Sequence, residues 1–160
     1  MDKLLSLIED NAKLTDEQLA AMLDRSVEEV REQVRQYEKV GIIKGYKAFI
    51  DWEKVDKDII IAFIEVKVTP QHNSGFEQVA ERIMQFEEVD SVYLMSGGFD
   101  FAVTVIGNSF KQVALFVAER LSPLENVTST ATHFILRKYK DKGVFFGTEK
   151  PDERGKISLC

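Results

Sequence analysis

Apolar residues recur at helical spacing through residues 1–40. Three short segments each place them three or four positions apart, which predicts three amphipathic helices. Thr15 followed by Gln18, and Ser26 followed by Glu29, form capping boxes that begin the second and third helices. The three apolar stripes are Leu4, Leu5 and Ile8; Leu19, Met22 and Leu23; and Val27, Val30, Val34 and Tyr37.

Only Asp24-Arg25-Ser26 separates the second helix from the third. Two helices joined this tightly cross steeply, as in a helix-turn-helix unit. Gly41 stands where a left-handed residue would end the third helix, and residues 42–51 then alternate loosely enough to predict a wing strand and connector. Such a unit usually lays its second helix in the major groove of DNA.

From residue 59 the pattern changes to β-branched runs that alternate with two amphipathic segments. Strands are predicted over residues 59–68, 89–95, 100–106 and 127–139, and helices over 75–86 and 109–121. The resulting order, βαββαβ, is the ferredoxin-like plan, in which both helices cover one face of an antiparallel sheet. The other face also carries apolar residues, so we expect a second copy of the chain to cover it.

The fold class is therefore α+β, with two domains. We assign residues 1–51 to a winged helix-turn-helix DNA-binding domain and residues 52–58 to a linker. Residues 59–140 form the βαββαβ effector-binding and oligomerisation domain, and residues 141–160 a C-terminal tail. Residues 140–147 are candidates for one more short strand, and the polar segment 148–159 is expected to be mobile.

Composition narrows the class of protein. With 160 residues and 44% hydrophobic content, the chain can build a real core. No apolar run approaches the ~18 residues that span a bilayer. The start lacks the features of a signal peptide, and the single cysteine, Cys160, forms no disulfide framework. We therefore expect a cytoplasmic protein without a membrane partner.

The net charge of −6 argues against a dominant basic surface. Residues 1–50 contain ten acidic and eight basic residues, so the N-terminal unit is itself slightly acidic. The third helix carries Glu28, Glu29 and Glu32 near its expected DNA-facing side. DNA binding must then depend on local arrangement, or on several copies acting together.

Candidate DNA contacts lie off the apolar stripe of the third helix and in the wing. Arginine can bond guanine edges and glutamine adenine edges, while the same side chains could instead form a solvated face with intrahelical pairs. Ser26 is expected to act mainly as a cap. The predicted DNA-binding residues are Thr15, Ser26, Arg31, Gln33, Arg35, Gln36, Lys44 and Lys47.

Candidate effector contacts surround a turn between two predicted strands. Gly97 and Gly98 permit close backbone approach. Asp100 could hold an amino group of the effector, or could simply fix the turn. Hydroxyl groups nearby in the expected fold could add partners, although strand preference alone also explains them. The predicted effector-binding residues are Ser96, Gly97, Gly98, Asp100, Thr130 and Thr132.

The order of these motifs resembles the Lrp/AsnC family of feast/famine transcriptional regulators. The segment Gly41-Ile42-Ile43-Lys44-Gly45-Tyr46 with Asp51, the turn Ser96-Gly97-Gly98-Phe99-Asp100, and Asn126-Val127 with Thr130 and Thr132 are similar to family signatures. The resemblance covers about Leu4 to Lys140. It implies a regulator that binds operator DNA, senses an amino acid or related metabolite, and forms homodimers that assemble into tetramers or octamers. It implies no catalytic residues, cofactor or metal.

Two departures from the family pattern keep alternatives open. The acidic third helix fits a metabolite-binding oligomer that has lost DNA binding. A few Lrp-like chains are sirohaem decarboxylases, and Arg137 and His133 are the only obvious candidates for such an enzyme. His72 and His133 have neither the spacing of a metal site nor a neighbouring nucleophile. The turn glycine of the family is Asp24 here, which tolerates a left-handed conformation less readily.

Overall fold

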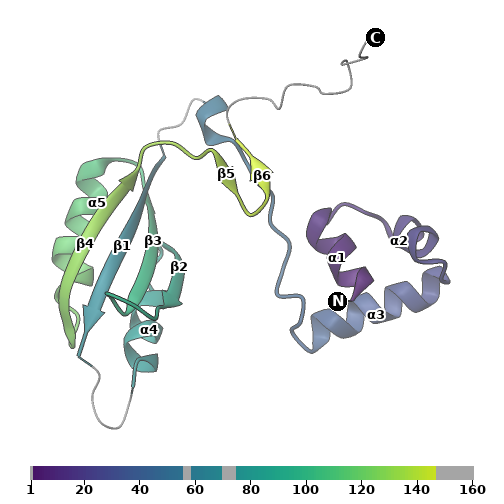
Figure 1. Cartoon of the computed structure of the whole chain (residues 1–160), viewed down its shortest axis with the longest axis horizontal. Coiled ribbons are helices and arrows are strands. Elements are labelled where there is room, and N and C mark those ends of the chain that lie inside the picture. The colour runs from purple at the N-terminus through teal and green to yellow at the C-terminus, as the bar shows by residue number, and fades with distance from the viewer. Residues whose placement is uncertain (1, 56–58, 70–74, 147–160) are drawn as a thin grey trace, which may run out of the picture. The chain divides into compact units, whose positions relative to one another are not determined.

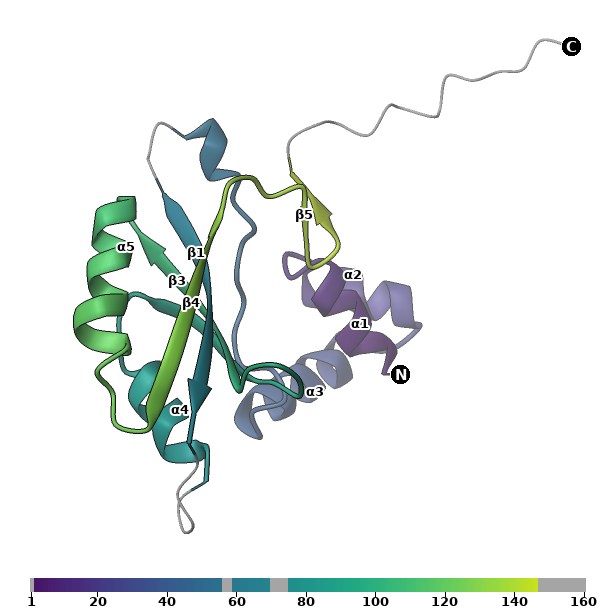
Figure 2. The ribbon, with the colours of Figure 1, turned by 60° about the vertical axis from the view of Figure 1, so that its left-hand side comes forward.

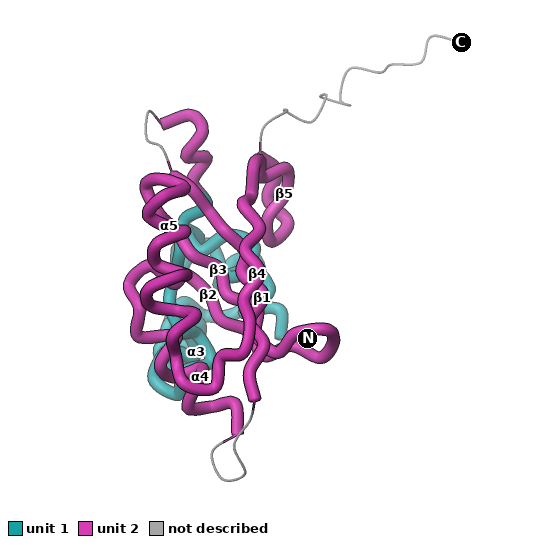
Figure 3. The backbone as a smooth tube through the Cα atoms, turned by 90° about the vertical axis from the view of Figure 1, so that its left-hand side faces the viewer, with its two compact units in different colours: residues 1–49 teal, residues 50–160 magenta. Residues whose placement is uncertain are grey.

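The structure is a computed structural model that describes residues 2–55, 59–69 and 75–146. The chain separates into two compact units between Phe49 and Ile50 (Figure 3). The sequence placed the end of the first domain at Asp51, two residues later. Among the described residues, no helix is long and apolar enough to cross a membrane.

Unit 1, the N-terminal unit, consists of three helices (Figure 1). They are α1 (Lys3–Asp10), α2 (Asp16–Leu23) and α3 (Val27–Lys39). Each helix contributes to one small core, because most of the predicted apolar positions face one another. Met22, which the sequence placed on the buried face of α2, is exposed. The buried members of that core are Leu4, Leu19, Ala20 and Val30.

Local polar groups set the helix boundaries of unit 1. Both predicted capping boxes are confirmed: Thr15 with Gln18 begins α2, and Ser26 with Glu29 begins α3. Asp24 ends α2 in the left-handed region, at φ 54°, so it occupies the conformation expected for a turn glycine. Because only three residues follow α2 before α3 begins, the helix-turn-helix geometry is confirmed.

The predicted wing strand is wrong for the single chain, since residues 42–50 contain no strand. The described residues of unit 1 contain no strand whose backbone groups could pair with this segment. The backbone N–H groups of Ile42 and Ile43 instead donate to the carbonyl of Tyr37. The hydroxyl of Tyr46 donates to the Glu38 carboxylate at 2.9 Å, and the Tyr46 ring remains exposed.

Unit 2 contains the predicted βαββαβ order. The elements are β1 (Ile60–Val68), α4 (Glu77–Met84), β2 (Val89–Leu94), β3 (Phe101–Gly107), α5 (Phe110–Phe116) and β4 (Val127–Ile135). All strand pairs are antiparallel, in the order β2-β3-β1-β4. Both helices lie on the same side of the sheet (Figure 2). The other side of the sheet is called the open face below.

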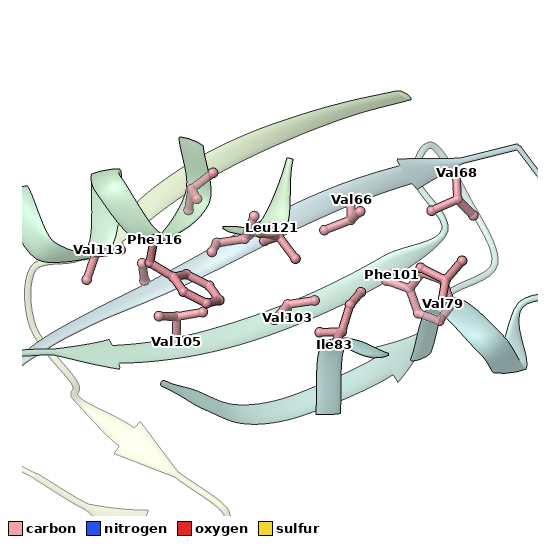
Figure 4. Close-up of a cluster of buried hydrophobic side chains, with 13 residues drawn as sticks. Val66, Val68, Val79, Ile83, Phe101, Val103, Val105, Val113, Phe116 and Leu121 are labelled. Carbon is pink, nitrogen blue, oxygen red and sulfur yellow. The ribbon is translucent and has the colours of Figure 1, made fainter. Parts of the chain in front are cut away.

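Thirteen buried apolar residues fill the space between the sheet and its helices (Figure 4). They come from alternate positions of β1 and β3, such as Ile64 and Val103, from α4 and α5, and from the turn that follows α5. The last turn of the second predicted helix, Val117–Leu121, widens into a π-helix. Leu121 is fully buried there, and the Arg120 guanidinium lies over the Phe86 ring at 4.7 Å.

Three predicted boundaries of unit 2 change. The strand expected to run to residue 139 ends at Ile135, because its partner β1 begins at Ile60 and Ile61 is already paired with Ile135. Within the expected linker, Trp52–Lys54 form a short 3-10 helix, η1. The predicted extra strand is a small hairpin of β5 (Lys140–Asp141) and β6 (Val144–Phe145). The predicted mobile segment 148–159 lies outside the described residues.

Candidate DNA-binding and effector-binding sites

The outward side of α3 is defined by helical geometry. Val30 is completely buried, and residues half a turn away from it project from the opposite side of the helix. The outward line consists of Glu28, Glu32, Arg35, Gln36 and Lys39, all of which are exposed. The line is acidic in the first half of the helix and basic in the second half. Arg35 and Gln36 are therefore the two predicted base contacts that the structure leaves on the outward side.

Arg31, which the sequence assigned to DNA, is committed to a contact between helices. Its Nε donates to the Asp16 carboxylate at 2.8 Å, and an Nη atom lies 3.8 Å from the Glu17 carboxylate. The hydrogen bond to Asp16 is the main cause that raises the pKa of Arg31. Since Asp16 begins α2, this pair links the two helices of the helix-turn-helix. Arg31 therefore positions α3 relative to α2.

Gln33 is also occupied within unit 1. Its carbonyl oxygen accepts from Arg25, and its amide nitrogen donates to the Tyr37 hydroxyl. That hydroxyl in turn donates to the Asp2 carboxylate. The chain of contacts ties the middle of α3 to the start of α1. The hydrogen bond from Tyr37 lowers the pKa of Asp2, and the same bond raises the pKa of Tyr37.

The remaining predicted DNA contacts lie at the ends of α2 and α3. The Thr15 and Ser26 hydroxyls accept from backbone N–H groups, at 3.3 Å from Gln18 and 3.2 Å from Glu29, so both are caps. Lys44 and Lys47 are exposed in the segment that follows α3. Their position is compatible with phosphate contact, although no strand holds them there.

The predicted effector turn is a closed loop between β2 and β3. The Met95 N–H donates to the Asp100 carbonyl at 2.8 Å and closes it. Ser96, Gly97 and Gly98 are exposed, and within the described residues their backbone N–H groups donate no hydrogen bond. A cluster of unused donors suits a carboxylate, because each N–H can donate to it.

Asp100 is held by the strand beside the loop. Its carboxylate accepts from the Val68 N–H at 2.8 Å, and its own N–H donates to the Val66 carbonyl at 3.0 Å. Asp100 therefore has the structural role that the sequence offered as one of two alternatives, because it holds the turn in place. The second carboxylate oxygen makes no hydrogen bond within the described residues, so one acceptor is left for a ligand.

Thr130 and Thr132 do not join this loop. Both lie on β4 and face the helices, since the Thr130 hydroxyl pairs with the Ser122 hydroxyl at 3.0 Å. Thr130 pairs with Val66 of β1 on the side of that strand away from β3, where Asp100 lies. Two interstrand spacings, about 10 Å, therefore separate the backbone of Thr130 from the backbone of Asp100. The six predicted residues do not form one set of contacts for a small ligand in a single chain.

The open face of the sheet combines apolar and charged side chains. Phe63 packs edge-on against Phe99, with ring centroids 6.1 Å apart. Two residues further along β1, on the same face, the Glu65 carboxylate lies 3.3 Å from His133 Nε2. Ile106 and Ile135 are exposed at one end of this face. A histidine–carboxylate pair on an exposed apolar face was not predicted, because it depends on the register between β1 and β4.

The structure also contains a cavity of about 410 Å³ that sequence reasoning did not find. Its walls come from the segment that carries η1, from the start of β1 and from the residues after β4. None of the predicted effector residues lines it. The lining residues are Ile50, Asp51, Trp52, Glu53, Val55, Ile59, Ile60, Ile61, Ile135, Leu136, Arg137, Lys138 and Phe146.

Comparison with known proteins decides the family. Residues 61–145, more than half of the chain, match the model of the Lrp/AsnC ligand binding domain. The chain belongs to the Lrp/AsnC family. It is a transcriptional regulator of that family, with a helix-turn-helix followed by the ligand-binding domain. The four-stranded sheet with two helices on one face is the matched domain.

Relatives and solved structures agree along nearly the whole length. The chain is 46% identical to an uncharacterised HTH-type transcriptional regulator, YugG, of Bacillus subtilis, over 98% of this chain and 95% of the relative. It is 27% identical to a leucine-responsive regulatory protein of Rhizobium meliloti, over 87% and 88%. The crystal structure of the Mycobacterium tuberculosis leucine response regulatory protein LrpA has a TM-score of 0.74 at 24% identity, over 92% and 100%.

Another similar structure is the complex of the Neisseria meningitidis transcriptional regulator NMB0573 with L-Met, with a TM-score of 0.71 at 23% identity, over 88% and 93%. The relatives named here are regulators, so the prediction that this Lrp/AsnC chain is not an enzyme agrees with its family. The decarboxylase alternative receives no support. His133 is paired with Glu65, and Arg137 Nε lies 3.9 Å from Glu53.

Proposed function

We propose that this Lrp/AsnC regulator binds a specific operator through α3, and that an amino acid bound in unit 2 modulates the binding. The observation that carries the proposal is the outward line of α3, in which Arg35, Gln36 and Lys39 remain available while Arg31 and Gln33 hold the helices together. Arginine and glutamine have the donor geometry to bond guanine and adenine edges in the major groove.

The effector proposal rests on the exposed donors of the loop between β2 and β3. An amino acid has a carboxylate that the N–H groups of Ser96, Gly97 and Gly98 could bind. Its ammonium group could bond the free oxygen of Asp100. The names of two similar proteins, a leucine-responsive regulator and a complex with L-Met, favour the same class of ligand.

The direct test of operator binding is titration of DNA from the protein's own upstream region against random DNA, at several salt concentrations. Lys44→Gln is expected to weaken binding to both DNAs and to reduce the salt slope by about 0.9, the value for one lost phosphate contact. Lys3→Gln, an equal change of charge on α1, is the matched control and should leave the slope unaltered. Equal and negligible affinity for both DNAs, with and without amino acids, would contradict the proposed operator binding.

The effector class can be tested separately from DNA. Calorimetry of the full chain with leucine, methionine and the other common amino acids should show one or more that bind. Asp100→Asn removes the negative charge while it keeps an acceptor for the Val68 N–H. It should weaken binding at least tenfold. Binding unchanged by Asp100→Asn would move the effector site elsewhere, and the cavity near Trp52 would be the next place to test.

We also propose that the open face pairs with a second copy of the chain, and that such dimers assemble into tetramers or octamers. Glu65, His133 and Lys67 give this face both acidic and basic groups, so it can complement itself across a twofold axis. Ile135→Glu should shift the mass in solution towards the monomer. Leu115→Glu is the control, since Leu115 is similarly exposed (44% against 41%) but lies on α5. An unchanged mass for Ile135→Glu would exclude this face.

A second candidate function is a metabolite-binding oligomer whose helix-turn-helix no longer reads DNA. Two observations favour it. Arg31 is paired with Asp16 and Glu17 and so is not available for DNA, and Glu28 and Glu32 lie on the outward line. The two functions differ in the DNA titration. Amino acid binding without any affinity for upstream DNA would support the second.

A further inference from the structure

Glu32 lies in the middle of the outward line of α3, and no contact among the described residues gives it a structural role. It lies in the interior of a 13-residue helix, beyond the capping box, and it is exposed. Among the described residues its carboxylate makes no hydrogen bond or ion pair. The two neighbouring acids differ: Glu29 completes the cap with Ser26, and the charge of Glu28 acts on Arg31.

A carboxylate on a DNA-facing helix can bind only certain groups. Phosphates repel it, so it gains nothing from the backbone of the duplex. In the major groove, the N4 amino group of cytosine is a donor from which Glu can accept a hydrogen bond. Adenine also presents an amino donor, N6, but its N7 acceptor lies beside it and repels a carboxylate, so Glu favours cytosine. Arg35 follows Glu32 by three residues and therefore projects from the same side of α3, one turn further along. Its guanidinium matches O6 and N7 of guanine.

We propose that Glu32 is a specificity-determining residue that accepts a hydrogen bond from cytosine N4, with Arg35 bonding a neighbouring guanine. Each operator half-site then contains a cytosine at the position that Glu32 reaches. It also contains a guanine close to that cytosine, at the position that Arg35 reaches one helical turn further along α3. This inference rests on the proposed DNA binding. It assigns the acidic part of α3 a role in selecting bases instead of treating it only as an obstacle to affinity.

The test is selection of bound duplexes from a randomised DNA library by the full-length protein, followed by competition titrations on the selected site. The wild type should enrich cytosine at one position of each half-site. Glu32→Gln should replace that preference with adenine or abolish it, because glutamine bonds adenine bidentately. Discrimination at that position should fall roughly 5- to 150-fold, the usual effect of one mismatched base pair in a specific site. Arg35→Ala should relax the adjacent guanine and leave the cytosine.

Glu9→Gln, on the exposed end of α1, is the matched control. It removes the same charge from unit 1 and should leave the selected sequence unchanged. The inference is overturned if the wild-type site has no cytosine preference, or if Glu32→Gln selects the wild-type site. Selection of no DNA by any variant would overturn the proposed operator binding as well, so the two failures are distinguishable. Circular dichroism of each variant confirms that α3 remains folded.

Discussion

Among the described residues, the buried core of unit 1 contains four apolar residues and that of unit 2 contains thirteen. In unit 1, polar side chains at helix ends and between helices also hold the helices in place. Examples are the hydrogen bonds of Arg31 with Asp16 and of Gln33 with Tyr37. In unit 2 the larger apolar core supplies more of the packing between elements, and polar contacts such as that of Asp100 with the Val68 N–H add to it. The difference teaches that a polar residue on the small unit is less available for a ligand than its sequence position indicates.

The largest expected effect comes from deleting a core side chain in each unit. Leu19→Ala and Ile64→Ala each remove a buried aliphatic group, at a loss of about 2–5 kcal/mol. Leu19→Ala should unfold unit 1 while unit 2 stays folded, because the smaller core has less stability to lose. Chemical denaturation is followed by fluorescence of Trp52, the only tryptophan, which reports unit 2. Helical circular dichroism reports both units, so a change in it without a change in the Trp52 signal reports unit 1. One shared transition for both variants would break the comparison.

Asp100→Ala tests whether a polar group also matters structurally in unit 2. The change leaves the Val68 N–H without its acceptor, so unit 2 should lose about 1–3 kcal/mol. Asp100→Asn, which keeps an acceptor, should lose much less. The measurement is the denaturation midpoint of the Trp52 signal. Equal stability of Asp100→Ala and the wild type would mean that packing alone holds this end of the sheet.

Ser26→Ala removes the cap of α3. Loss of the hydrogen bond to the Glu29 N–H should destabilise unit 1 by about 1 kcal/mol and leave unit 2 unchanged. Ser26→Asp is the informative partner, since aspartate caps equally well. It should preserve stability, and any fall in DNA affinity would then come from the added charge. A stable Ser26→Ala variant would contradict the dependence of unit 1 on its caps.

The smallest effect concerns pH. The Tyr37 hydrogen bond lowers the pKa of Asp2, so its stabilising contribution is present above the ordinary aspartate pKa and disappears as pH falls through the lowered value. The pKa of Tyr37 is raised, so that contribution is complete below the ordinary tyrosine pKa and disappears as pH rises through the raised value. Tyr37→Phe should flatten both limbs in melting curves of unit 1. An unaltered pH profile in that variant would remove this bond from the account.

Local spacing was enough to predict most of the fold. The capping boxes and the βαββαβ order depend on residues a few positions apart or on regular alternation. The wing strand failed because alternation predicts a strand but cannot supply its partner. β4 ended early for the same reason, since its partner β1 begins at Ile60.

The candidate sites depend on contacts between residues far apart in the chain. Arg31 and Asp16 are fifteen residues apart and meet only because α2 and α3 cross. The Val68 N–H finds Asp100 across thirty-two residues. Thr130 and Thr132 were predicted to contact the effector together with the loop, but they face the helices, which follows from the register of β4 on β1. Such pairings cannot be predicted from the spacing of one segment.

The turn at Asp24 has a consequence for engineering. A non-glycine residue held at φ 54° is strained by about 1 kcal/mol relative to glycine. Asp24→Gly would relieve that strain without touching any side chain on the outward line of α3. The stability gained from Asp24→Gly could offset the stability lost through substitutions on α3. Variants designed to alter base preference are best built on that background.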